Sequence, residues 1–182
     1  MIETDSNWHR VHARIDRLLV PVENAAACVS GVFTALAMVL TTLDALMRYL
    51  FSAPLVFQFY LTANYLLVGI ILMALPWGFR TGGYIRVSIL TEVMPERLRF
   101  LLFRVGLLVS AAYLALLAWK GWQYFLKTWL SGQVYVEDLN WPVYLSWIWI
   151  PVGMGLLTLR VLMVAFGPAE HLHVEHDPEE DL

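Results

Sequence analysis

The sequence predicts an all-α integral membrane protein with four antiparallel transmembrane helices, both termini in the cytoplasm and short interfacial amphipathic helices. Hydrophobic residues make up 59% of the 182 residues and charged residues only 15%, whereas soluble domains carry about 25% charged residues. The mean hydropathy is +0.63. Four apolar segments are each long enough to cross a bilayer, which takes about 20 residues. These observations together predict a membrane-spanning helical fold.

The same composition excludes several classes of protein. A soluble globular enzyme and a disordered chain would both need fewer apolar and more charged residues. A nucleic-acid-binding protein would need a basic surface, but the formal net charge is −3. The single cysteine, Cys28, excludes an intramolecular disulfide and a cysteine-based metal cage.

Residues 1–21 are expected to form an interfacial helix on the cytoplasmic leaflet. Apolar residues recur at helical spacing, and basic residues lie between them. The apolar positions are Trp8, Val11, Ile15, Leu18 and Leu19. A basic anchor that sets the topology explains this pattern, and a contact with a specific partner is the alternative.

A transmembrane domain is expected over residues 22–164, followed by an acidic cytoplasmic tail over residues 165–182. Its spans are expected at about residues 22–43, 55–79, 98–125 and 142–163. The third span is extended by Arg104 and Lys120, whose long side chains can reach the interfaces. Continuous apolar runs without strict alternation favour helices over a β-barrel.

The distribution of basic residues predicts the orientation. Nine lie before the first span, between the second and third spans, or after the fourth: Arg10, Arg14, Arg17, Arg80, Arg86, Arg97, Arg99, Arg104 and Arg160. Three lie on the other side: Arg48, Lys120 and Lys127. Basic residues are enriched in cytoplasmic loops, so both termini are expected in the cytoplasm.

Polar residues within the spans are few and mostly uncharged. Gln58 in the second span can bond across a helix interface, and Gly153 with Pro151 shapes the fourth span, where the proline is expected to kink or break the helix. Asp44 and Arg48 lie four residues apart at the outer end of the first span and can form an ion pair. Helix packing is the first interpretation of these residues, and cation or substrate binding is the alternative.

The loop after the second span contains two consecutive glycines, Gly82 and Gly83, which permit a tight turn between Arg80 and Arg86. The remaining residues of a phosphate-binding P-loop are missing, so we expect no nucleotide site there.

No catalytic residue, cofactor site or metal site is expected. All five histidines lie in the terminal segments, so the spans offer no axial ligand for haem. Three of them, His171, His173 and His176, invite a metal interpretation, but an acidic solvated tail explains them as well. The spans also lack a central acidic residue and paired broken helices, which are typical of complete transporters. The sequence therefore predicts a subunit that supports a larger membrane complex.

Three motifs resemble the small membrane subunits of TRAP transporters (tripartite ATP-independent periplasmic transporters), the DctQ-like family. The resemblance covers about residues 22–164. The first motif is Asp44-Ala45-Leu46-Met47-Arg48-Tyr49-Leu50-Phe51 followed by Pro54-Leu55. The second is Phe79-Arg80-Thr81-Gly82-Gly83-Tyr84-Ile85-Arg86-Val87, with Tyr84 where the family usually has histidine. The third is Trp141-Pro142 through Tyr144, then Ile150-Pro151-Val152-Gly153 and Leu159-Arg160. Gln58 stands where the family often has an acidic pair.

The resemblance implies an accessory permease subunit in the bacterial inner membrane. Its partners would be a large multi-span permease subunit, membrane lipids and, indirectly, a periplasmic substrate-binding protein that delivers an organic acid. An ion gradient would drive uptake, and the substrate and ion sites would belong to the large subunit. The alternative from the residues alone is an anchor or assembly subunit of an unrelated membrane complex, while a stand-alone membrane enzyme would need a catalytic constellation that the sequence does not offer.

Overall fold

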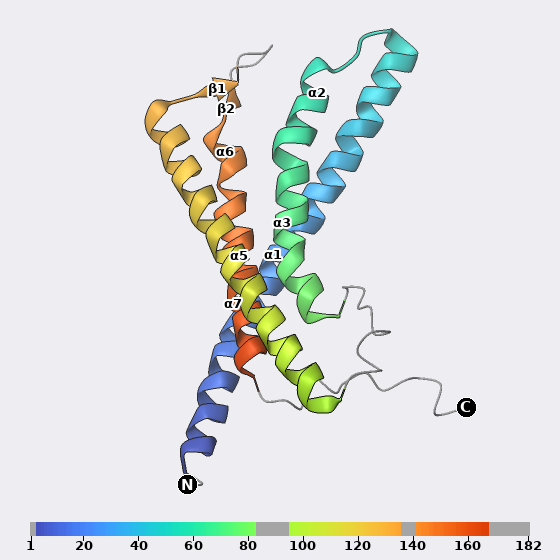
Figure 1. Cartoon of the computed structure of the whole chain (residues 1–182). Helices are drawn as coiled ribbons and strands as arrows, with labels where there is room; N and C mark the ends of the chain where they lie inside the picture. The colour runs from blue at the N-terminus through green and yellow to red at the C-terminus, as the bar shows by residue number, and fades with distance from the viewer. Residues whose placement is uncertain (1–2, 83–94, 136–140, 168–182) are drawn as a thin grey trace, which may run out of the picture.

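The computed structural model describes residues 3–82, 95–135 and 141–167 (Figure 1). Four helical segments in these ranges are long and apolar enough to cross a membrane: Arg14–Phe51, Phe57–Arg80, Leu98–Ser131 and Tyr144–Phe166. They confirm the four predicted spans, and successive spans run in opposite directions (Figure 1).

The first span belongs to a single 49-residue helix, α1 (Glu3–Phe51), which contains Pro21. At 1.5 Å per residue this helix is roughly 70 Å long, more than twice the thickness of the hydrocarbon core. The expected boundary between residues 21 and 22 lies inside α1, so the structure has one helix where the sequence predicts two elements. A proline removes only one backbone hydrogen bond, and the helix continues through it.

The second span consists of three consecutive elements: α2 (Val56–Leu61), the π-helical turn η1 (Thr62–Leu66) and α3 (Leu67–Arg80). A π turn inside an α-helix adds one residue to the turn and changes which side chains face a neighbour. The apolar pattern of residues 55–79 gives no sign of this turn.

The third span, α5 (Glu96–Ser131), begins after Pro95 and ends at Gly132. It extends six residues beyond the expected end, residue 125, because the chain stays helical until Gly132 adopts a left-handed conformation with φ of +59°. A two-residue antiparallel pair follows, in which β1 (Val134–Tyr135) lies against β2 (Trp141–Pro142).

The fourth span consists of the short helix α6 (Tyr144–Trp147) and the longer α7 (Trp149–Phe166). Ile148 between them keeps helical backbone angles (φ −64°, ψ −31°) and donates to the carbonyl of Tyr144, so the span continues through the region of Pro151 with locally irregular bonding. Proline has no N–H to donate to the carbonyl of Trp147, four residues earlier, and its ring crowds that carbonyl.

The helices pack in a row rather than around a common axis: α3 lies against α1 and α7, and α7 lies against α5. Ala26, Leu72 and Met73 form one buried apolar cluster between α1 and α3. A second cluster joins α5 and α7 through Ala111, Leu157 and Val161. Figure 1 shows the α1–α3 pair and the α5–α7 pair crossing in the lower half of the view and separating toward the end that carries α2, β1 and β2.

The crossing of α3 and α7 depends on Gly153. A Cβ atom at this position would lie 2.5 Å from the carbonyl oxygen of Leu72 and 2.8 Å from its Cβ atom. Because the first of these atoms belongs to the backbone, the two helices would have to separate to admit a side chain.

We therefore expect Gly153→Ala to lower the stability of the protein by about 1–3 kcal/mol, the usual cost of overpacking. The measurement is thermal unfolding of the purified protein in detergent. Gly155→Ala is the matched control, because a Cβ atom there meets nothing within 4 Å. The control should be neutral or stabilising by up to about 1 kcal/mol. Equal destabilisation by both variants would contradict this role for Gly153.

Candidate functional site

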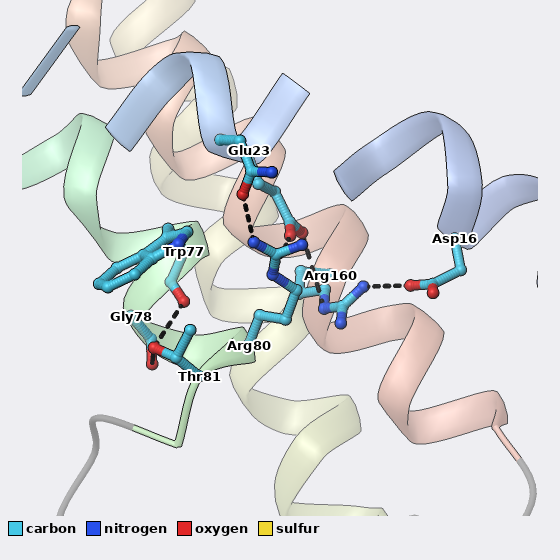
Figure 2. Close-up of polar contacts among 8 residues, drawn as sticks. Asp16, Glu23, Trp77, Gly78, Arg80, Thr81 and Arg160 are labelled. Carbon is cyan, nitrogen blue, oxygen red and sulfur yellow. Dashed lines mark hydrogen bonds and ion pairs between the residues drawn. The ribbon is translucent and has the colours of Figure 1, made fainter. Parts of the chain in front are cut away.

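Charged side chains of the spans form two groups, one at each edge of the apolar part of α1. The first group, which we call the four-charge cluster, consists of Asp16, Glu23, Arg80 and Arg160 (Figure 2). It joins α1 to the last residue of α3 and to α7. Two carboxylates and two guanidinium groups give it a formal charge of zero.

Glu23 lies at the centre of the cluster, with its side chain 0% exposed. Its Oε2 atom is 3.2 Å from Nε of Arg80, and its Oε1 atom is 3.6 Å from Nε of Arg160. Arg160 also pairs with Asp16 through Nη1, as Figure 2 shows. Arg80 donates a further hydrogen bond to Asn24. The buried carboxylate is therefore held between two cations from two other helices.

Local helix geometry explains how these residues meet. Asp16 and Glu23 are seven residues apart, so they lie on the same face of α1, two turns from each other. Arg80 ends α3, where a cation also interacts favourably with the helix dipole. From the sequence, Arg80 is expected in a loop motif, and Glu23 and Asp16 have no expected role. The available signals were an acidic residue at the edge of an apolar span and its seven-residue spacing from Asp16.

The second group, which we call the α1–α2 clasp, closes the opposite end of α1. The Oδ2 atom of Asp44 accepts a hydrogen bond of 2.9 Å from Nη2 of Arg48, and its Oδ1 atom accepts one of 2.7 Å from the backbone N–H of Leu55. Leu55 is the residue that precedes α2, so Asp44 fixes the loop that contains Pro54 to the end of α1. The predicted pair of Asp44 and Arg48 is therefore part of a loop anchor.

Gln58 extends the clasp into the apolar region. The residue is buried, and its Nε2 atom donates to Oγ1 of Thr41 at 3.0 Å and to Oγ1 of Thr62 at 3.4 Å. An uncharged amide thus links α1 to the second span. Tyr49 is 87% exposed beside the clasp. It lines an open hollow of about 460 Å³ together with Thr41, Asp44, Ala45 and Arg48.

The two groups are separated by about the thickness of a bilayer core. Glu23 and Asp44 are 21 residues apart in one helix, which corresponds to roughly 31 Å. The hydrocarbon core is about 30 Å thick. The charged groups therefore match the two edges of the apolar layer, and only uncharged polar groups lie between them on α1.

Hydrogen bonds between these levels join the helices to one another. The hydroxyl of Ser30 donates to the carbonyl of Ile70 at 2.8 Å, and the hydroxyl of Tyr65 donates to the carbonyl of Pro142 at 2.9 Å. Ser146 donates to the carbonyl of Asn64, within the π turn. In these contacts, polar residues of the spans take part in helix packing. Helix packing is the first interpretation of the polar residues from the sequence.

The remaining predicted residues are placed as follows. Gly82 has φ of +74°, a conformation that favours glycine, and open space around its Cα atom. Pro151 lies where α7 approaches Gly121 of α5. Gly83, Arg86 and the histidines of the tail lie outside the described residues. Within the described ranges, no group of three or more His, Cys, Asp or Glu side chains could hold a metal ion.

From the four-charge cluster, we expect Glu23→Gln to cause a large loss of stability. The variant leaves two guanidinium groups with the single carboxylate of Asp16, and breaking a buried pair in this way costs about 3–5 kcal/mol. Thermal unfolding in detergent measures the loss. The double variant Glu23→Gln/Arg160→Gln should lose less stability than the two single variants lose together. Strictly additive losses would contradict the coupling of the two side chains.

From the α1–α2 clasp, we expect two variants of Asp44 to differ in their loss of stability. Asp44→Ala leaves the N–H of Leu55 without its acceptor, which costs about 1–3 kcal/mol. Asp44→Asn keeps an acceptor and loses only the pair with the exposed Arg48, which costs about 1 kcal/mol or less. Limited proteolysis of the loop at residues 52–55, together with thermal unfolding, distinguishes the two. Equal effects of the two variants would show that the charge of Asp44, which both remove, matters more than the loop anchor.

Comparison with known proteins agrees with this architecture. Residues 37–170 match the family described as "Tripartite ATP-independent periplasmic transporters, DctQ component". A C4-dicarboxylate TRAP transporter small permease protein DctQ from Vibrio cholerae serotype O1 is 26% identical over 170 residues, covering 79% of this chain and 72% of the relative. The protein of the same name from Rhodobacter capsulatus is 29% identical over 102 residues, covering 55% of this chain and 44% of the relative. Since the family match spans most of the sequence, including the clasp and the two arginines of the four-charge cluster, the chain belongs to the DctQ component family of TRAP transporters.

Proposed function

We propose that this chain braces the large permease subunit of a TRAP transporter during uptake of an organic acid or a related solute by symport. A periplasmic binding protein would deliver the solute, and an ion gradient would drive its entry. As a DctQ component, the chain is a multi-pass small permease subunit. The relatives are named for C4-dicarboxylates, which makes a small organic anion the first substrate class to test.

The observation that carries the bracing role is the internal use of the polar side chains. Glu23, Asp44 and Gln58 are all buried, and each is bonded or ion-paired to another helix or to a neighbouring loop of the same chain. Such groups hold helices at fixed positions, so they are not available to a passing solute. This supports a partner subunit as the place where substrate and ion bind.

The surfaces of the two longest helices support the need for a partner. α1 and α5 expose large apolar side chains along most of their length, on several faces. In a bilayer such faces contact lipid or the helices of another subunit. We place the chain in the bacterial inner membrane with both termini in the cytoplasm. The four-charge cluster would then lie at the cytoplasmic edge and the α1–α2 clasp at the periplasmic edge.

The decisive experiment is co-expression of this chain with the large permease subunit and the binding protein of the same transporter. The tagged chain should retain the large subunit through purification, and cells that lack only this chain should lose most C4-dicarboxylate uptake. Full uptake without the chain would overturn the proposal. Loss of uptake for dicarboxylates but not for another solute class would identify the substrate.

A variant of Glu23 tests whether the four-charge cluster contributes to bracing the large subunit. Glu23→Gln should lower uptake and the yield of the complex together, because it loosens α3 and α7 from α1. Arg48→Gln is the control, since its guanidinium is mostly exposed and its pair with Asp44 contributes little. Unchanged complex yield and uptake for Glu23→Gln would show that the cluster serves only the stability of the isolated chain.

A further inference from the structure

The arginines near the four-charge cluster fall into two classes. Arg80 and Arg160 lie within ion-pair distance of carboxylates and are neutralised inside the protein. In the part of the chain that the structure describes, four others at this end of the molecule have no carboxylate within 4.0 Å: Arg14, Arg17, Arg99 and Arg104. This end therefore carries positive charge that the described fold does not use for ion pairs.

Arg104 is the most fixed of these four side chains. Its Nε atom donates a hydrogen bond of 3.0 Å to the carbonyl of Ala165 near the end of α7, and its guanidinium lies 5.0 Å from the ring centre of Phe100. The bond to Ala165 uses one of five N–H groups of the guanidinium. The side chain is therefore held in place, and none of the described residues bonds to its other donors, which can bind an anion.

The apolar surface next to Arg104 fits an acyl chain. Val105 and Leu108 lie one and four residues after Arg104, so they adjoin it on α5 on the side toward the middle of the helix. Val105 is 48% exposed and Leu108 is 39% exposed. A cation at the membrane edge followed by an exposed apolar face matches the order of headgroup and acyl chain in a phospholipid.

The basic residues of α1 lie beyond the edge of the apolar layer, within side-chain reach of lipid headgroups. Arg17 and Arg14 precede Glu23 by six and nine residues in one continuous helix, which places them roughly 9 and 14 Å beyond it. Since Glu23 marks one edge of the apolar layer, their side chains reach the phosphate region of the adjoining leaflet.

We propose that this end of the molecule binds anionic phospholipids, with Arg104 as the headgroup ligand and Val105 and Leu108 against the acyl chain. Arg14, Arg17 and Arg99 add attraction to the same leaflet. A free phosphate would use the guanidinium but not the apolar face, so the lipid uses more of the observed surface. The proposal does not depend on the identity of the transported solute.

The test is native mass spectrometry of the full-length chain released from detergent and titrated with phosphatidylglycerol or phosphatidylcholine. Arg104→Gln should weaken phosphatidylglycerol binding about fivefold, the effect of one basic residue near an anionic surface. Lys127→Gln makes the same charge change at the opposite end of α5 and should change binding less than twofold. Equal losses for both variants would overturn the site.

Two further measurements separate lipid binding from a loss of stability in Arg104→Gln, which also loses its bond to Ala165. Arg14→Gln combined with Arg17→Gln removes no ion pair among the described residues and should still weaken phosphatidylglycerol binding more than fivefold. Inorganic phosphate at millimolar concentration should not displace the lipid. Displacement by phosphate, or equal binding of phosphatidylcholine, would overturn the assignment to anionic lipid.

Discussion

A carboxylate without access to water needs cations beside it, and this constraint organises one end of the molecule. Removing a carboxylate from water costs several kcal/mol even after the protein relaxes. Glu23 meets this need with one arginine from α3 and one from α7. Neither helix can leave α1 without exposing an unpaired charge to an apolar environment. The position of α3 and the crossing of α7 over α1 both depend on this arrangement.

Polarity is distributed along α1 according to depth. Charged groups occupy the two edges of the apolar layer, while hydroxyl and amide groups make the contacts between them. Inside a bilayer the hydrophobic effect does not drive helices together, so close packing at small residues and hydrogen bonds must provide specificity. Gly153 against Leu72 and Ser30 against Ile70 provide one contact of each kind. The protein thus uses ion pairs at the two edges of the apolar layer and uncharged hydrogen bonds between them.

Local sequence patterns were enough to predict the four spans, because each is a continuous apolar run of sufficient length. The pair of Asp44 and Arg48 was also predictable, since its members are one helical turn apart. The four-charge cluster was not, because the partners of Glu23 come from distant parts of the chain and only the packing of α3 and α7 brings them close. The continuity of α1 through Pro21 was not predictable for a different reason. The change from basic to apolar composition near residue 21 suggests the end of one helix there, but the helix continues.

The π turn η1 sets the rotational phase of the second span. In a regular α-helix, one extra residue turns everything after it by about 100°. Before the turn, Gln58 faces α1, whereas within it Asn64 and Tyr65 meet the segment that leads into α7. The second span can therefore contact both α1 and the segment that leads into α7 without a break in its backbone. Removal of a single residue from η1 would leave the span almost as long and as apolar as before, yet it would put the two halves out of phase with one of their partners. The length of this segment is thus constrained more tightly than its composition, which hydropathy alone does not reveal.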